Sequence, residues 1–288
     1  MVNIFLFEKE EVSEDGIASI EREDKVKHII KILKYKEGST LRAGIVGVGK
    51  GIGTITKMEK QKIELKIEIN EVEVEKKSNI VLVIAIPRPS MVSKILQAAA
   101  TMGVDRILFI SSARIEQNYF MSMVTQEKEY RKDLIKGAEQ GVTTRLPVVS
   151  FHQRPFSKFI TEKLSTFYEQ IDDEKALKLV AELREPKNLL YHVDQVAKKR
   201  GPSFSLDEQV FVVAVGPEGG WISEEVEQMK ANGWLGFHMG EPVMRTETAF
   251  VAVCAQILMV KSSHFLFQQN QEKEEKELEG DCKGKEEK

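Results

Sequence analysis

Two strand–turn–helix units follow one another in the C-terminal part of the chain, and they constrain the fold more than any other sequence feature. Residues 210–215 are a continuous apolar and largely β-branched run, which predicts a strand buried on both faces. This run enters the turn at 216–220, which is too rich in glycine and proline to continue a strand or a helix. Ser223, followed by two glutamates, predicts the start of a helix that ends near residues 232–233.

The second unit repeats this order, with a short strand at 236–239, a tight turn at 240–242 and a long apolar helix over residues 245–259. In an open α/β sheet, ligands bind outside the carboxyl ends of the strands. Glycine turns there let backbone groups approach a ligand, and helix starts supply N–H groups without partners. The spacing alone therefore predicts either a ligand site of unknown specificity or two turns that only reverse the chain.

The residues of the two turns point to a family. The sequence GPEGG at 216–220 is followed, after one helix–strand unit, by MGEPVMRTETA at 239–249. These motifs resemble the paired signature of the SPOUT RNA methyltransferases. More narrowly, they resemble the RsmE-type family, which methylates N3 of a uridine in small-subunit ribosomal RNA. The resemblance covers residues 1–265 and implies an α/β fold whose parallel sheet domain is tied in a trefoil knot, an exception to the rule against threaded chains.

The resemblance implies S-adenosylmethionine as the cofactor, bound among three loops by backbone groups and apolar side chains. Residues 188–192 (NLLYH) have the pattern of a strand that leads into the third loop, so we expect the end of this segment to lie beside the cofactor. The expected cofactor neighbours are His192, Val215, Gly216, Pro217, Glu218, Gly219, Gly220, Met239, Gly240, Val243, Met244 and Thr246.

Methyl transfer from a sulfonium is an in-line displacement, so catalysis depends on positioning and on control of charge. Uracil N3 must lose a proton, and a donor to a neighbouring carbonyl oxygen stabilises the developing anion. Arg245 is the candidate for this donor because it stands at the start of a helix. Glu247 or Glu218 is expected to orient Arg245 or to accept the proton through water. The alternative for residues 245–248 is a helix cap with an ion pair, and Pro242 stands where the family usually has a second arginine.

Residues 1–72 have the pattern of a small β-rich unit, with expected strands at 3–7, 40–46, 53–58 and 63–69 and a helix at 23–33. In the resembled family this position holds a PUA-like or OB-like RNA-binding barrel. The unit is rich in lysine, which indicates either a solvated mixed surface or a patch that contacts phosphates. Lys31 and Lys34 are the candidates for RNA contacts.

From residue 80 onward, strands alternate with helices, which predicts a parallel sheet. The expected elements are strands at 80–86 and 106–110 and helices at 92–102, 126–140 and 156–168. Residues 98–101 are uncharged where the family has a basic residue and an acid.

Two segments in the middle of the chain contain arginines at family positions. The segment SSARIEQNY resembles the family's S-E-R-S loop and places Arg114 at its arginine. A second segment, residues 137–147, resembles A-x-E-Q-S-G-R-x-R-x-P. Arg145 stands at the second arginine of this pattern, and Thr143 takes the place of the first. The resemblance implies that Arg114 and Arg145 contact RNA. Glu139 in the same motif is either a site residue or a structural acid with internal partners.

The chain has 288 residues, enough for two domains, and we expect boundaries at 1–72, 73–267 and a charged, disordered tail at 268–288. The net charge of −3 gives no sign of nucleic-acid binding, so any basic surface must be local. Cys254 and Cys282 have no metal-binding spacing, and we expect neither a zinc site nor a disulfide. Without a signal peptide or an apolar span, a soluble cytoplasmic protein is expected.

The leading hypothesis is an S-adenosylmethionine-dependent methyltransferase that modifies uridine N3 in small-subunit ribosomal RNA as a homodimer, with the apolar helix after residue 249 at the dimer interface. One alternative is the same fold acting on another RNA target or atom, such as a ribose hydroxyl. Another is a non-catalytic RNA-binding assembly factor, which the missing arginines at positions 143 and 242 favour.

Overall fold

The computed structural model describes residues 3–72, 77–162, 164–166, 175–201 and 204–262. These residues form two compact units. Of the described residues, one unit takes those up to Lys77, Arg88–Asp105 and Met121–Val148, and the other takes Ser78–Pro87, Arg106–Phe120 and those from Val149 onward. The expected boundary after residue 72 stays a prediction, and the expected disorder of residues 268–288 lies outside the described part of the chain.

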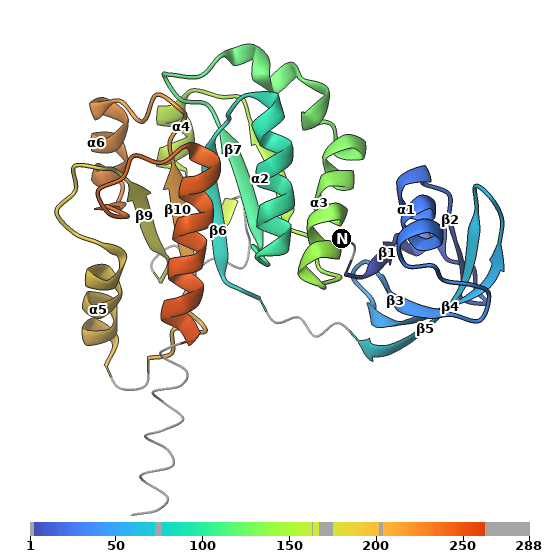
Figure 1. Cartoon of the computed structure of the whole chain (residues 1–288). Coiled ribbons are helices and arrows are strands. Elements are labelled where there is room, and N and C mark those ends of the chain that lie inside the picture. Colours follow the sequence, from blue (N-terminus) through green and yellow to red (C-terminus); the bar gives the residue numbers. More distant parts are fainter. Residues whose placement is uncertain (1–2, 73–76, 163, 167–174, 202–203, 263–288) are drawn as a thin grey trace, which may run out of the picture. The chain divides into compact units, whose positions relative to one another are not determined.

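The first unit contains a five-stranded sheet with strand order β1-β3-β4-β5-β2 (Figure 1). Its pairs are antiparallel except for β1, which runs parallel to β3. Ile63, Leu65 and Ile67 alternate into its core, as the two-residue period of a half-buried strand requires. The predicted β-rich unit is confirmed, while its assignment as a PUA-like barrel stays a prediction. The strands are β1 (Phe5–Phe7), β2 (Ile17–Ile20), β3 (Thr40–Ile45), β4 (Gly49–Met58) and β5 (Ile63–Val72).

Three helices complete this unit: α1 (Glu23–Lys27), which continues as a π-helical turn over His28–Ile32, α2 (Pro89–Thr101) and α3 (Glu127–Gly141). The contact between α2 and α3 is too close for large side chains. A Cβ on Gly137 would lie 2.0 Å from the carbonyl oxygen of Gln97, and the Thr101 hydroxyl donates to the Gly137 carbonyl at 2.9 Å. Ala99 and Ala100 are fully buried. Within the uncharged stretch 98–101, Ala100 and Thr101 therefore belong to a helix–helix contact.

The second unit is built on a six-stranded sheet with strand order β11-β9-β10-β6-β7-β8. Figure 1 labels its strands β9, β10, β6 and β7. The pairs from β11 to β7 are all parallel, which confirms the predicted parallel sheet. Every residue of β6 and β10 is buried, as their continuous apolar runs predict. The strands are β6 (Ile80–Ala85), β7 (Arg106–Ile110), β8 (Val148–His152), β9 (Leu177–Ala181), β10 (Phe211–Val215) and β11 (Leu235–Phe237).

The helices of this unit correct two expectations. The prediction of a strand at 188–192 is wrong: the side chain of Asn188 accepts the N–H of Tyr191 at 3.0 Å and starts a helix there. The strand that lies between β10 and β11 in the sheet is β9, which begins eleven residues before residue 188. The helix expected over 156–168 is shorter, and residues 167–168 lie outside the described part. The helices are α4 (Phe156–Thr161), α5 (Leu189–Arg200), α6 (Ser223–Ala231) and a final helix over residues 246–262.

None of the helices in the described ranges combines the length and the apolar character needed to cross a bilayer. Within the same ranges, no three His, Cys, Asp or Glu side chains converge as metal ligands would. The thiol of Cys254 lies inside the final helix's buried face, and burial raises its pKa to about 12. It is therefore protonated at neutral pH and is no candidate nucleophile.

Candidate active site

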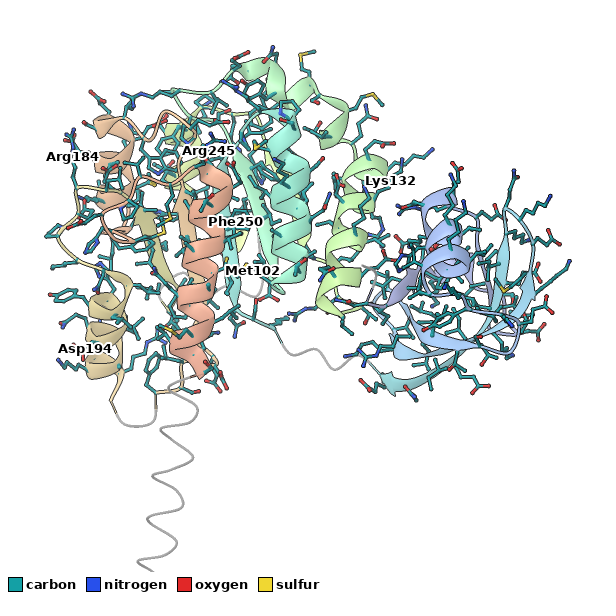
Figure 2. The ribbon with its side chains drawn as sticks, viewed as in Figure 1. Met102, Lys132, Arg184, Asp194, Arg245 and Phe250 are labelled. Carbon is teal, nitrogen blue, oxygen red and sulfur yellow. The ribbon has the colours of Figure 1, made fainter. Side chains whose placement is uncertain are left out.

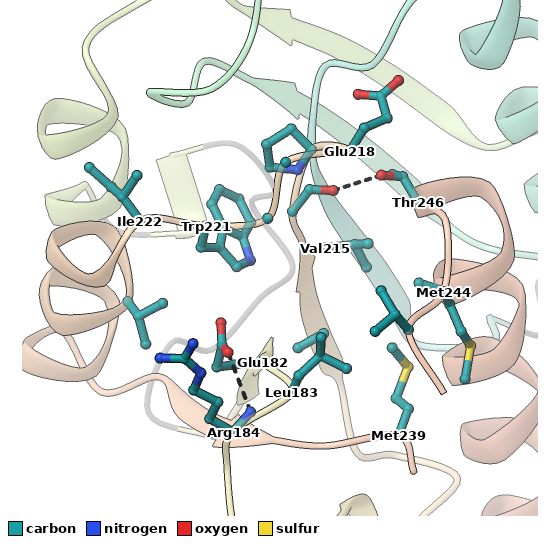
Figure 3. A pocket seen from close by; sticks show the side chains of 18 of the residues that line it. Glu182, Leu183, Arg184, Val215, Glu218, Trp221, Ile222, Met239, Met244 and Thr246 are labelled. Atoms are coloured by element: carbon teal, nitrogen blue, oxygen red, sulfur yellow. Dashed lines mark hydrogen bonds between the residues drawn. The ribbon is translucent and has the colours of Figure 1, made fainter. Parts of the chain in front are cut away.

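A cavity of about 610 Å³ opens at the carboxyl ends of β9, β10 and β11 (Figure 3). Three segments contribute most of its lining: residues 181–184 from the end of β9, residues 215–223 from the end of β10, and six residues between β11 and the first turn of the final helix, namely Met239, Gly240, Pro242, Val243, Met244 and Thr246. Both glycine turns therefore face one cavity. Of the two sequence interpretations of these turns, the ligand site is the one that this arrangement favours.

The turn after β10 is closed tightly on itself. A Cβ on Gly216 would lie 3.2 Å from both the backbone nitrogen and the Nε1 of Trp221, closer than most side chains tolerate. Gly220 has φ +70°, a conformation that costs other residues energy. The Arg114 side chain packs against Gly219, and Arg114 Nη1 donates a hydrogen bond to the Gly219 carbonyl. Glycine is thus required at this turn by the backbone itself.

A partly buried hydrogen bond ties the two turns together. The hydroxyl of Thr246, which is 3% exposed, donates to the carbonyl of Gly216 at 2.9 Å (Figure 3). Thr246 is also the first residue of the final helix. The start of this helix is therefore held directly beside the β10 turn.

We expect Thr246→Val to weaken cofactor binding by about tenfold, because the Gly216 carbonyl loses its donor and the turn is released. Isothermal calorimetry with S-adenosylhomocysteine measures the change. Thr248→Val is the matched control: Thr248 is exposed in the same helix and does not line the cavity. Equal affinities for both variants would show that this hydrogen bond does not shape the site.

The third wall of the cavity comes from β9 rather than from the segment predicted to form it. Ala181 ends the strand, and Glu182, Leu183 and Arg184 follow it along the cavity. The Glu182 carboxylate accepts the backbone N–H of Arg184 at 3.3 Å. The apolar run before Glu182 is the sequence signal that would have identified this strand and its loop.

His192, which was predicted to lie beside the cofactor, does not line the cavity. It lies in α5, is 6% exposed and has its Nε2 2.9 Å from the carbonyl oxygen of Gly236. Because the predicted strand is a helix, this side chain faces β11 and has a structural partner there.

The other predicted cofactor residues are brought together as expected: the cavity is lined by Val215, Gly216, Pro217, Glu218, Gly219, Gly220, Met239, Gly240, Val243, Met244 and Thr246. Their roles in binding stay predictions.

The two catalytic candidates, Arg245 and Glu247, do not line the cavity. Figure 2 shows Arg245 at the start of the final helix, where its side chain is exposed, and Glu247 is half-buried. Arg245 forms no ion pair among the described residues. Of the alternative, a helix cap with an ion pair, only the cap is therefore present: the Arg245 carbonyl accepts the backbone N–H groups of Thr248 and Ala249.

The residues predicted to bind RNA have different surroundings. Lys31 and Lys34 are exposed in the first unit. Arg114 lines the cavity. Arg145 is half-buried, lies 3.2 Å from a carboxylate oxygen of Asp105 and donates to the Gly103 carbonyl. This arginine therefore stabilises its own loop, and the RNA contacts of all four residues stay predictions.

Glu139 was predicted to be either a site residue or a structural acid, and the structure favours the second interpretation. It is 3% exposed, forms an ion pair with Lys25 and accepts the backbone N–H of Leu6 at 3.1 Å. The carboxylate is engaged inside the first unit and not at the cavity.

A model of the RNA methyltransferase domain family matches residues 74–258 of this chain. The chain belongs to the RNA methyltransferase family. The matched range contains every residue that lines the cavity, and the resemblance to the RsmE-type family is confirmed.

Similar methyltransferases extend over nearly the whole chain. Ribosomal RNA small subunit methyltransferase E of Treponema pallidum is 29% identical over 261 residues, which are 89% of this chain and 91% of that protein. Ribosomal RNA small subunit methyltransferase E 1 of Borreliella burgdorferi is 26% identical over 229 residues, which are 79% of this chain and 87% of that protein. Both matches are longer than the range 74–258 that the family model covers.

Two solved structures are similar in fold. Ribosomal RNA small subunit methyltransferase E of Neisseria gonorrhoeae, bound to S-adenosylmethionine, is 19% identical with a TM-score of 0.64 and covers 90% of this chain and 98% of that chain. A Legionella pneumophila protein in complex with the same cofactor is 18% identical with a TM-score of 0.66 and the same coverage. The likeness confirms the predicted α/β fold with a parallel sheet.

Proposed function

We propose that this RNA methyltransferase uses S-adenosylmethionine to methylate N3 of a uridine in small-subunit ribosomal RNA. The observation that carries the proposal is the convergence of both glycine turns and the β9 loop on one cavity, tied by the Thr246–Gly216 hydrogen bond. The names of the two relatives support ribosomal RNA of the small subunit as the substrate.

The cavity fits the proposed cofactor in size and in chemistry. Its volume of about 610 Å³ lies within the usual range for small-molecule sites. Val215, Met239 and Met244 offer apolar surface to the adenosine part, and the turn backbone offers hydrogen-bonding groups. When bound, the cofactor supplies an electrophilic methyl group on a sulfonium.

The chain's own residues control the charge of the nucleophile. We propose that Arg245 donates to a uracil carbonyl oxygen and stabilises the anion that forms when N3 loses its proton. Glu218 is exposed on the wall of the cavity and is the better placed of the two acids to accept that proton through water. Glu247, half-buried two residues after Arg245, orients the guanidinium.

The finer features of the fold belong to the same proposal: a trefoil knot that passes the final helix behind the 216–220 turn, a PUA-like RNA-binding barrel in the first unit, and a cytoplasmic location. The Thr246–Gly216 hydrogen bond supports the knot, because the helix start and the turn are in direct contact. Nuclear magnetic resonance mapping of RNA binding onto the first unit tests the role of the barrel.

We also propose a homodimer. Val251, Ala255 and Met259 are exposed along one stripe of the final helix, since residues four apart share a face. Met259 is 58% exposed. Burial of this apolar surface against a second copy of the chain would be favourable, because it removes the surface from water. Light scattering that gave the mass of a single chain would refute it.

The activity is tested with S-adenosylmethionine labelled in its methyl group and small ribosomal subunits that lack the modification. We expect label in 3-methyluridine after digestion to nucleosides, and more label in assembled subunits than in naked RNA. Label on a ribose hydroxyl or another base would support a different target. Cofactor binding without any transfer would support the non-catalytic assembly factor.

A further inference from the structure

One wall of the cavity carries a buried hydrogen-bond donor that has no acceptor. The indole of Trp221 is 6% exposed, and its Nε1 is among the few buried side-chain atoms of the described residues that lack a partner. Figure 3 shows this nitrogen directed into the cavity, toward the wall formed by residues 182–184. Buried donors are nearly always satisfied in folded proteins, so an acceptor from a ligand is expected here.

Two charged side chains stand on that facing wall. Glu182 and Arg184 line the cavity directly after β9 (Figure 3). Within the described ranges, the Arg184 guanidinium forms no ion pair, whereas the two other cavity cations already have partners. Lys230 pairs with Glu185, and Arg114 donates to the Gly219 carbonyl. Arg184 is therefore the cavity cation available to a ligand.

We propose that Trp221, Glu182 and Arg184 form a subsite for the α-amino-acid end of the cofactor, an inference that rests on the proposed function. The group to be bound is a zwitterion, with one carboxylate and one ammonium. The Arg184 guanidinium and the Trp221 N–H are both donors and suit the carboxylate, while the Glu182 carboxylate suits the ammonium. The apolar wall of Leu183 and Val215 is left for the adenosine part.

Two ligands that share the adenosine part separate this subsite from the rest of the cavity. S-adenosylhomocysteine contains the amino-acid end, and 5′-methylthioadenosine lacks it. We expect Arg184→Met to weaken binding of S-adenosylhomocysteine by about tenfold, the effect of a lost charge-assisted hydrogen bond, and to leave the affinity for methylthioadenosine unchanged. Isothermal calorimetry on the full chain measures both affinities.

Trp221→Phe tests the indole donor, because phenylalanine keeps an aromatic ring at this position, next to Phe156, and removes the N–H together with one of the two fused rings. We expect it to weaken S-adenosylhomocysteine selectively as well. Lys187→Met is the matched control, since it removes a cation three residues beyond Arg184 that lies over the Tyr191 ring and outside the cavity. It is expected to change neither affinity.

If Arg184→Met weakens both ligands equally, or neither, the subsite is wrong while the proposed function stands. A wild-type chain that binds neither ligand overturns the proposed function and the subsite together. Arg184 is exposed, so Arg184→Met is expected to fold. If Trp221→Phe does not fold, the Arg184→Met result tests the proposed subsite without it.

Discussion

Replacing Arg245 by alanine is expected to lower the turnover of methyl transfer by about 100-fold or more while the cofactor affinity stays within a few-fold, as for the loss of a donor to a developing oxyanion. The structure separates the two effects because Arg245 is exposed beside the cavity without lining it. Its backbone carbonyl, which accepts from Thr248 and Ala249 at 2.9 and 2.8 Å, remains in the variant. The helix start is therefore preserved and only the guanidinium is lost.

Single-turnover transfer to small ribosomal subunits measures the first quantity, and calorimetry with S-adenosylhomocysteine measures the second. Arg245→Lys keeps the positive charge but not the planar donor geometry, so it should recover part of the turnover. Unchanged turnover in Arg245→Ala would remove this residue from the mechanism.

Lys25→Met should lower the free energy of unfolding by about 3–5 kcal/mol, because removal of one partner leaves a buried charge uncompensated. Lys25 and Glu139 are 8% and 3% exposed and pair with each other inside the first unit. In the variant, the described contacts of the Glu139 carboxylate are reduced to the backbone N–H of Leu6.

Denaturant titration followed by circular dichroism measures this loss. Arg22→Met is the control from the same segment: Arg22 pairs with Asp24 at 2.7 Å, but their side chains are 46% and 67% exposed. Such surface pairs contribute at most about 1 kcal/mol. A Lys25 variant no less stable than the Arg22 variant would show that burial adds nothing to the Lys25–Glu139 pair.

Features that depend on local sequence were predicted well. The strand expected at 210–215 is Phe211–Val215, and the strand expected at 106–110 is Arg106–Ile110. Their continuous apolar runs and the glycine turn at 216–220 are properties of adjacent residues. Local sequence failed at 188–192, where apolar residues suggested a strand but the Asn188 side chain caps a helix.

The partners of single side chains could not be predicted in this way. His192 was expected at the cofactor because of its place after an apolar run, yet it meets the Gly236 carbonyl 44 residues away. Arg145 matched a family arginine but pairs with Asp105, and Trp221 gave no sign in the sequence of an unpaired donor in a cavity wall. Each of these facts depends on which distant segment lies opposite.

The sequence by itself determined the buried strands at 80–85, 106–110 and 211–215, the two glycine turns and the helix start at Ser223, because short-range periodicity and backbone preference specify them. Only the tertiary structure decided that β9 lies between β10 and β11, which brings Glu182 and Arg184 to the same cavity as both turns. Strand order depends on long-range pairing and packing of surfaces that are all similarly apolar, and no local pattern distinguishes one neighbour from another.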